Sequence, residues 1–255
     1  MEPALYDHFE RIEDDHWWWR ARRAIVLELL KNLRRAGSPA RVLEVGCGMG
    51  AQLSALPPEF EGYGTEISEQ AVRRCRERGL SRVVLCEGAD LPFERGFFQV
   101  AMALDVLEHL DGERPLLDGL SNVLEDGGTL LVTVPAHAWL WTRWDDMNRH
   151  KRRYTRTSLT AALRSAGFEV RFCSYFNFFM FPLAVLRRVL DGLVRTADGA
   201  DLPAGARIPA AWMNRTFAFV FGVERLLLAR ERHFPCGSSV LAVARKRGPT
   251  SSVVN

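Results

Sequence analysis

Three glycines at alternate positions follow a run of β-branched and aliphatic residues. The run covers residues 42–45, and the glycines are Gly46, Gly48 and Gly50. Glycine tolerates positive φ and a close approach of ligand to backbone, both of which are needed where a strand turns sharply beneath a ligand. The backbone N–H groups at such a turn form a cradle for a nucleotide-like ligand. The spacing therefore predicts a ligand pocket at the carboxyl end of this strand.

An acidic residue ends the next strand-like segment. Glu66 follows the glycine turn by about twenty residues, where a carboxylate binds the ribose hydroxyls of a nucleotide. Gly46, Gly48 and Ala51 also satisfy the loose dinucleotide-binding fingerprint, which accepts alanine in the third place. These residues are compatible with an NAD(P)-dependent oxidoreductase, with another nucleotide-binding enzyme, or with an ordinary strand–turn–helix.

Three further motifs follow along the chain. Residues 88–93 read Gly-Ala-Asp-Leu-Pro-Phe after a third strand-like run, and residues 105–110 read Asp-Val-Leu-Glu-His-Leu after a fourth. Residues 124–135 supply a helix end, a glycine turn and a fifth strand. In this order the motifs resemble the class I S-adenosylmethionine-dependent methyltransferases over residues 40–176. An NAD(P)-dependent oxidoreductase is the alternative, although no second mononucleotide half with its own glycine turn follows.

The resemblance implies a binding site for S-adenosylmethionine, whose product is S-adenosylhomocysteine. Gly46 and Gly48 would let the methionine part of the cofactor lie on bare backbone, and Glu66 would bind both ribose hydroxyls. Asp90 would accept a hydrogen bond from the adenine amine. The cofactor residues that the resemblance implies are Glu44, Gly46, Cys47, Gly48, Gly50, Glu66, Ile67, Ala89, Asp90, Leu91, Leu104 and Asp105.

Methyl transfer requires little chemical assistance from the protein beyond positioning, because the sulfonium of the cofactor is already activated. A general base helps only when the acceptor arrives protonated. We expect His150 to be that base, with Asp145 orienting its ring and Arg153 acting as an anion clamp. Tyr154 belongs to the same group of catalytic candidates.

His109 follows the fourth strand-like run and is a further catalytic candidate. It is compatible with a base or with a metal ligand beside Asp105 and Glu108. The favoured alternative is a histidine at a helix start that hydrogen-bonds to backbone. The five cysteines are scattered and have no paired spacing, which argues against a zinc cluster and against a disulfide framework. No metal centre is predicted.

Aromatic residues are expected on the acceptor side. Residues 16–23 and 150–155 resemble two signatures of one bacterial branch of these methyltransferases. Neighbouring residues on a helix point about 100° apart, so the three adjacent tryptophans cannot all face one core, and some are expected to cover the cofactor mouth. Arg20 would then reach the cofactor's carboxylate. The acceptor-binding candidates are Trp18, Trp19, Trp139, Trp141, Trp144 and Arg153, with plain structural packing as the alternative.

Strand-like and helix-like segments alternate five times after a first amphipathic helix, which predicts a parallel sheet with helices on both faces. The resemblance adds an antiparallel hairpin, residues 168–176 and 239–245, at the edge of a Rossmann-like, seven-stranded, mostly parallel α/β sheet. We predict an N-terminal helical cap over residues 1–38 and a methyltransferase domain over residues 39–176 and 236–247. A helical insertion covers residues 177–235, and a disordered tail covers residues 248–255.

The insertion carries a helix that is apolar around most of its circumference. Residues 211–229 show only a narrow stripe of small or polar side chains, so this helix needs more than one apolar neighbour. We expect packing within the chain together with a homodimer contact. The alternative is contact of residues 177–230 with a membrane surface, which would favour a hydrophobic or lipid-linked acceptor.

Composition limits the remaining function classes. The chain has 255 residues, 47% of them hydrophobic, and a formal net charge of +3, which fits a packed globule without a bulk attraction to nucleic acid. Its polar, acidic start does not resemble a signal peptide, so a cytoplasmic location is expected, or a peripheral one at the inner membrane face. The sequence predicts a methyltransferase that acts on a small-molecule, glycan or lipid-linked acceptor, at oxygen rather than nitrogen. A non-catalytic membrane or partner-binding module is the second alternative.

Overall fold

The computed structural model describes residues 8, 10–33, 40–193 and 207–248. Most of the predicted tail, and the first seven residues of the predicted cap, lie outside these ranges. The centre is a seven-stranded sheet with the strand order β3-β2-β1-β4-β5-β7-β6. Its strands are β1 (Ala40–Val45), β2 (Phe60–Glu66), β3 (Val83–Leu85), β4 (Phe98–Leu104), β5 (Leu124–Pro135), β6 (Phe168–Phe176) and β7 (Ser239–Lys246).

The first five strands pair in parallel, and β7 pairs antiparallel with both β5 and β6. The predicted seven-stranded, mostly parallel, Rossmann-like sheet with an antiparallel edge pair is therefore confirmed. The order reverses between β1 and β4, and ligands of open α/β sheets bind outside the carboxyl ends of the strands at such a switch point.

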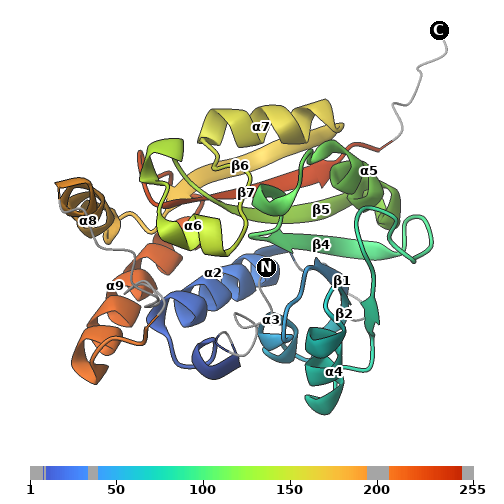
Figure 1. Ribbon diagram of the computed structural model, residues 1–255. Coiled ribbons are helices and arrows are strands. Elements are labelled where there is room, and N and C mark those ends of the chain that lie inside the picture. Colours follow the sequence, from blue (N-terminus) through green and yellow to red (C-terminus); the bar gives the residue numbers. More distant parts are fainter. Residues whose placement is uncertain (1–7, 9, 34–39, 194–206, 249–255) are drawn as a thin grey trace, which may run out of the picture.

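Helices cover both faces of the sheet (Figure 1). On one face lie α5 (Arg114–Val123) and α7 (Arg156–Ser165), and on the other lie α2 (Trp17–Leu33) and α9 (Ala211–Ala229). The remaining elements are α3 (Ala51–Ser54), α4 (Glu69–Glu77), α6 (Arg143–Met147), α8 (Phe181–Leu193) and the short 3₁₀ turns η1 (Leu107–His109) and η2 (Ala138–Leu140).

The central strands are apolar on both sides because both sides are covered. In β1, Leu43 belongs to the core cluster beneath α5 and α7, while its neighbour Val42 belongs to the cluster beneath α2 and α9. In β4, Ala101 and Met102 divide in the same way. Successive side chains of a strand alternate between faces, so a strand with helices on both faces reads as a continuous hydrophobic run.

The segment between β6 and β7 contains α8 and α9. The ring of Trp17 on α2 lies 5.3 Å from Phe217 and 5.5 Å from Phe221, both on α9. The backbone N–H of Trp17 also donates to the side-chain oxygen of Asn214 at 2.9 Å. The first helix and the segment before the last strand therefore pack together against one face of the sheet (Figure 1).

A buried carboxylate anchors α9 to the end of β6. Glu224 is fully buried and accepts hydrogen bonds from the backbone N–H groups of Asn177 and Phe178. Burial raises the pKa of Glu224 to about 7, against the opposing effect of these backbone donors.

Large apolar side chains on α8 and α9 remain on the surface. They are Leu183, Leu186, Val189, Leu190, Trp212, Phe219, Val223 and Leu226. Trp212 is 70% exposed and Phe219 is 75% exposed, so the contact with α2 covers only part of α9. Within the described ranges, none of the helices is both long enough and apolar enough to cross a bilayer.

Candidate active site

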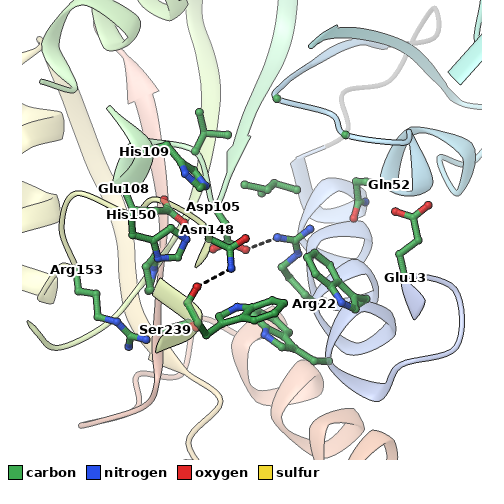
Figure 2. Close-up of a pocket in the computed structure, with 18 of the residues that line it drawn as sticks. Glu13, Arg22, Gln52, Asp105, Glu108, His109, Asn148, His150, Arg153 and Ser239 are labelled. Atoms are coloured by element: carbon green, nitrogen blue, oxygen red, sulfur yellow. Dashed lines mark hydrogen bonds and ion pairs between the residues drawn. The ribbon is translucent and has the colours of Figure 1, made fainter. Parts of the chain in front are cut away.

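A cavity of about 1230 Å³ opens at the carboxyl ends of β1, β2 and β4. It extends from the glycine turn after β1 across α2 to the segments that follow β4 and β5. Figure 2 shows Gln52 and Glu13 at one end, Arg22 and Asp105 between, and Glu108, His109 and His150 at the other end. Ligand pockets for one small molecule usually enclose about 300–1,000 Å³, so this cavity has room for two ligands side by side.

The glycine turn and Glu66 form one hydrogen-bonded unit. Oε2 of Glu66 accepts from the backbone N–H of Gly48 at 2.8 Å, and Oε1 accepts from the N–H groups of Ile67 and Ser68 at 3.0 Å. Gly46 and Gly48 have φ values of +66° and +55°. An acidic side chain at the tip of β2 is thereby held at the cavity wall beside bare backbone.

The end of the cavity beside the glycine turn has a shape that accommodates a nucleoside. A Cβ added to Gly48 would meet nothing within 4 Å, so the space above the turn is open. Ile67 is 59% exposed and lines the cavity, where it offers an apolar face to a planar ring. Glu44 is buried and lines the same region; burial raises its pKa to about 8, although the nearby Arg22 acts in the opposite direction.

Several predicted cofactor residues do not line the cavity. Gly50 caps α3 with a φ of +80°, and a Cβ at this position would meet Leu80 and Cys75. The predicted adenine residues lie after β3: Asp90 is exposed, Ala89 is half-buried, and Leu91 packs in the core beneath α5. In that region Cys86 and Gly88 line the cavity instead. Of the two predicted apolar cofactor residues Ile67 and Leu91, only Ile67 lines the cavity, because the side chain of Leu91 packs in the core.

Arg22 occupies the place in the cavity that was predicted for Arg20. Arg20 is exposed and does not line the cavity. Arg22 forms an ion pair with Asp105 at the end of β4 and lies over the ring of Trp19, with its guanidinium carbon 4.9 Å from the ring centre. Residues three or four apart share one face of a helix, so the side chain that accompanies Trp18 and Trp19 is Arg22.

At the end of the cavity away from the glycine turn, the carboxylate of Asp145 binds two residues that line the cavity, His150 and Arg153. This carboxylate is fully buried and lies 2.9 Å from Nδ1 of His150. It also accepts two hydrogen bonds of 2.8 Å from the guanidinium of Arg153. Although burial acts to raise it, these partners hold the pKa of Asp145 well below its usual range. The structure thus brings His150 and Asp145 together. Arg153 donates to Asp145 and to the Ala136 carbonyl, and its role as an anion clamp stays a prediction.

Glu108 and His109 lie beside His150. Glu108 is fully buried, and neither of its carboxylate oxygens has a hydrogen-bond partner. Burial, with Asp105 close by, raises the pKa of Glu108 well above its usual range. The rings of His109 and His150 meet edge to face at 4.7 Å between centres. Burial and the neighbouring His150 lower the pKa of His109 to about 4, so this imidazole is neutral.

The predicted acceptor-side aromatics divide into two groups. Trp18, Trp19, Trp141 and Trp144 line the cavity. Trp139 is 52% exposed and packs against Phe181 outside it. Tyr154 is buried in the core, where its hydroxyl donates to the carbonyl of Leu107 at 3.4 Å and burial raises its pKa. Tyr154 was predicted among the catalytic candidates; it does not line the cavity.

Sequence reasoning missed several cavity residues. They are Ile12, Glu13, Arg22, Gln52, Asn148, Arg187, Arg188 and Ser239. Helical spacing from Trp18 and Trp19 could have found Arg22, and the polar segment before His150 could have found Asn148. Gln52 carries no comparable signal, although its buried amide has neither its oxygen nor its nitrogen hydrogen-bonded.

Comparison with known proteins decides among the nucleotide-binding classes. Residues 17–171 match a family model described as a methyltransferase domain. The chain belongs to this methyltransferase family. It is a class I S-adenosylmethionine-dependent methyltransferase, as the motif order indicated, and its cofactor is S-adenosylmethionine. The NAD(P)-dependent oxidoreductase is not supported.

Two curated relatives illustrate the range of the family. A tRNA (carboxymethyluridine(34)-5-O)-methyltransferase of Arabidopsis thaliana is 30% identical over 152 residues, which are 57% of this methyltransferase and 35% of the plant protein. A probable S-adenosylmethionine-dependent methyltransferase of Mycolicibacterium smegmatis is 30% identical over 164 residues, 62% of each chain. The matched region therefore spans about a third of one relative and less than two thirds of the other.

A solved structure shares the fold. An S-adenosylmethionine-dependent methyltransferase from Archaeoglobus fulgidus superimposes with a TM-score of 0.56 at 19% identity, covering 88% of this chain and 92% of that one. The open space above Gly48, the acid at the tip of β2 and the exposed apolar Ile67 fit the adenosine and methionine parts of S-adenosylmethionine.

Proposed function

We propose that this methyltransferase transfers a methyl group to a hydroxyl oxygen of a hydrophobic or lipid-linked small molecule or glycan, and that His150 activates that hydroxyl. The observation that carries the proposal is the 2.9 Å contact between Nδ1 of His150 and the buried carboxylate of Asp145. A carboxylate at Nδ1 fixes the tautomer of an imidazole and leaves the lone pair on Nε2.

His150 lines the cavity, and we infer that its Nε2 lone pair serves the acceptor. S-adenosylmethionine supplies the methyl group from a positively charged sulfur: the acceptor oxygen bonds to the carbon, the carbon–sulfur bond breaks, its electron pair stays on sulfur, and the hydroxyl proton leaves. The chain has to hold the acceptor in line and assist the loss of that proton. Oxygen is favoured over nitrogen because a hydroxyl needs this assistance. The name of the Arabidopsis relative also specifies an oxygen acceptor.

The wall around the acceptor end supports a hydrophobic, anionic substrate. Trp18 and Trp141 line the cavity. From α8, Ala184, Arg187 and Arg188 line the cavity as well. Flat aromatic walls suit sugar rings and planar molecules, and arginine suits phosphate or carboxylate groups.

The opposite side of α8 presents apolar side chains to solvent, including Leu183, Leu186 and Leu190. Trp212 and Phe219 on α9 are exposed as well, and we refer to these side chains of α8 and α9 as the apolar surface. One helix thus has arginines toward the cavity and leucines on the outside. This arrangement supports peripheral contact with a membrane from which a lipid-linked acceptor enters, with homodimerisation through the same surface as the competing use.

A transfer assay with radiolabelled S-adenosylmethionine tests the reaction. The lipid, polar small-molecule and RNA fractions of the protein's native cells serve as acceptors. Label is expected in a lipid-extractable product, and His150→Ala should reduce it about 100-fold, the lower range for loss of acid–base assistance. The matched control is His233→Ala, because His233 is exposed and lies outside the cavity. Label only in RNA would reject the proposed acceptor class.

The membrane contact is tested separately, by flotation with anionic vesicles. Phe219→Ser and Leu186→Ser together should reduce vesicle binding without changing S-adenosylhomocysteine affinity, because neither residue lines the cavity. A dimer in solution that these substitutions dissociate, combined with no vesicle binding by the wild type, would assign the apolar surface to homodimerisation instead.

A further inference from the structure

We propose that Glu108, His109 and His150 hold a first-row divalent transition-metal ion at the acceptor end of the cavity. One carboxylate oxygen and one nitrogen from each ring all lie within 4.8 Å of one another. All three residues line the cavity, and Figure 2 shows them gathered at one end. Two imidazoles and one carboxylate with open positions form a donor set that suits such ions. The site departs from the sequence prediction, which expected no metal centre.

The carboxylate of Glu108 is buried without a hydrogen-bond partner, which favours a cation beside it. Both carboxylate oxygens are buried and have no hydrogen-bond partner, although the side chain faces the cavity. A buried carboxylate without a partner loses its hydration with nothing to replace it, so proteins pair such groups or coordinate metals with them. The neighbouring Asp105 cannot supply the partner, because it is itself an acid and pairs with Arg22.

Each histidine ring has a polar neighbour. Nδ1 of His150 faces Asp145 at 2.9 Å, and the backbone of Asn148 lies near the ring of His109, where it acts to raise the pKa of that ring. Metal-binding histidines nearly always donate their second ring N–H to a carboxylate or a backbone carbonyl, which fixes the other nitrogen toward the ion. Asp145 is in turn fixed by Arg153. The outer partners of a metal site are therefore already in place.

The chain segments that carry the three residues are tied together. Glu108 and His109 belong to η1, just beyond β4, and His150 lies in the segment after α6. The backbone N–H of Lys151 donates to the carbonyl of Glu108 at 2.7 Å, which links the two segments next to the cluster. Bonds of about 2.0–2.2 Å to the ion bring donors closer than 4.8 Å, so small side-chain adjustments complete the site.

The ion would deepen the proposed function, on which this step rests. A divalent ion at the cluster binds the acceptor's hydroxyl oxygen and lowers the pKa of that hydroxyl, so that its proton passes to water before the oxygen bonds to the methyl carbon. His150 then activates the acceptor as a ligand of the ion. An acceptor with two neighbouring oxygens, such as a sugar diol or a catechol, would occupy two open positions.

Direct metal binding by the full chain tests the site. After treatment with a chelator, the protein is titrated with Co²⁺ by visible absorption and with Zn²⁺ by calorimetry. One ion per chain is expected, with Glu108→Gln and His109→Ala each weakening binding at least tenfold. Asp145→Asn should weaken it about 10–100-fold, the range for outer-shell partners. Glu113→Gln and His233→Ala are the controls; Glu113 pairs with Arg152, and both residues lie outside the cluster.

The outcomes separate this site from the methyl-transfer proposal. Calorimetry with S-adenosylhomocysteine on the same variants shows whether each still folds and binds cofactor. If the wild type binds Co²⁺ no better than Glu108→Gln, while S-adenosylhomocysteine binding and methyl transfer persist, then the metal site is rejected and Glu108 is a protonated buried acid. If S-adenosylhomocysteine does not bind but Co²⁺ does, then the proposed function fails and the metal site stands.

Discussion

Oε2 of Glu66, at the tip of β2, accepts a 2.8 Å hydrogen bond from the backbone N–H of Gly48, in the turn after β1. Two strand ends that are adjacent in the sheet are thereby joined at the cofactor end of the cavity. Glu66 thereby holds the glycine turn, and we propose that it also supplies the charge for the ribose hydroxyls.

Replacement of Glu66 tests this arrangement. Glu66→Ala should weaken S-adenosylhomocysteine binding by about 1.5–3 kcal/mol, the range for hydrogen bonds to a charged group. Calorimetry measures the affinity, and Glu69→Ala, in the first turn of α4 beyond the cavity, is the control. An affinity equal to that of the control would remove Glu66 from the cofactor site.

Alanine substitutions at the glycines of the turn should distinguish effects on cofactor binding from effects on stability. Gly48→Ala places a methyl group in open cavity space, whereas Gly50→Ala places it 2.4 Å from Leu80 Cδ1. Both residues have positive φ, which costs an alanine about 1–2 kcal/mol. Gly79→Ala is the control for this strain alone, because it has a φ of +82° and no atom within 4 Å.

Denaturation and calorimetry should therefore give three different results for these variants. Gly48→Ala and Gly79→Ala should lose similar amounts of unfolding free energy, but only Gly48→Ala should lose tenfold or more in S-adenosylhomocysteine affinity. Gly50→Ala should be the least stable of the three, because its methyl group also displaces core atoms. Equal cofactor affinities for Gly48→Ala and Gly79→Ala would contradict the placement of the cofactor on the turn.

Asp145→Asn should destabilise the protein strongly. The substitution removes the anion between His150 and Arg153, and the side chain of Arg153 is only 11% exposed. A buried cation left without its partner costs about 3–5 kcal/mol, which urea denaturation would measure. Asp111→Asn is the matched control, since Asp111 pairs with Lys151 but is 90% exposed; it should leave the unfolding free energy unchanged. Comparable losses in both variants would mean that the Asp145 network is open to solvent.

Glu224 should make stability depend on pH. Its carboxyl loses a proton near 4.5 in the unfolded chain and near 7 in the native chain, where burial raises the pKa. The native state therefore binds more protons within this window, and the unfolding free energy should fall by up to about 3 kcal/mol as pH rises from 4.5 to 8. Glu224→Gln should flatten this slope, whereas Glu169→Gln, at an exposed carboxylate, should not. Parallel curves for wild type and Glu224→Gln would exclude this source of pH dependence.

The sequence predicted the sheet well because its signals are local. The continuous apolar run of β4 and the glycines at the ends of β1 mark buried parallel strands directly. The boundary of β5 was less evident: the structure begins the strand at Leu124, before Gly127 and Gly128, where the pairing with β4 has a register shift. Glycines that usually mark a turn lie here within an irregular strand pair.

The site was less predictable, because its residues are joined by tertiary contacts. Asp145, His150 and Arg153 lie close in sequence, and their association could be anticipated. The positions of Leu91 and Tyr154 could not, because a motif does not show which face of its segment meets the core. Likewise, Glu108 and His109 reach His150 only through the fold. The sequence offered His109 as a metal ligand beside Asp105 and Glu108, but it did not indicate that His150 joins them.

The strands β6 and β7 are hydrogen-bonded neighbours, yet α8 and α9 lie between them in sequence. A segment inserted between two paired strands can change in length or composition without altering the hydrogen bonds between those strands. Arg187 and Arg188 of this segment line the cavity, whereas the glycine turn follows β1. We therefore infer that the choice of methyl acceptor can change during evolution without altering the cofactor site.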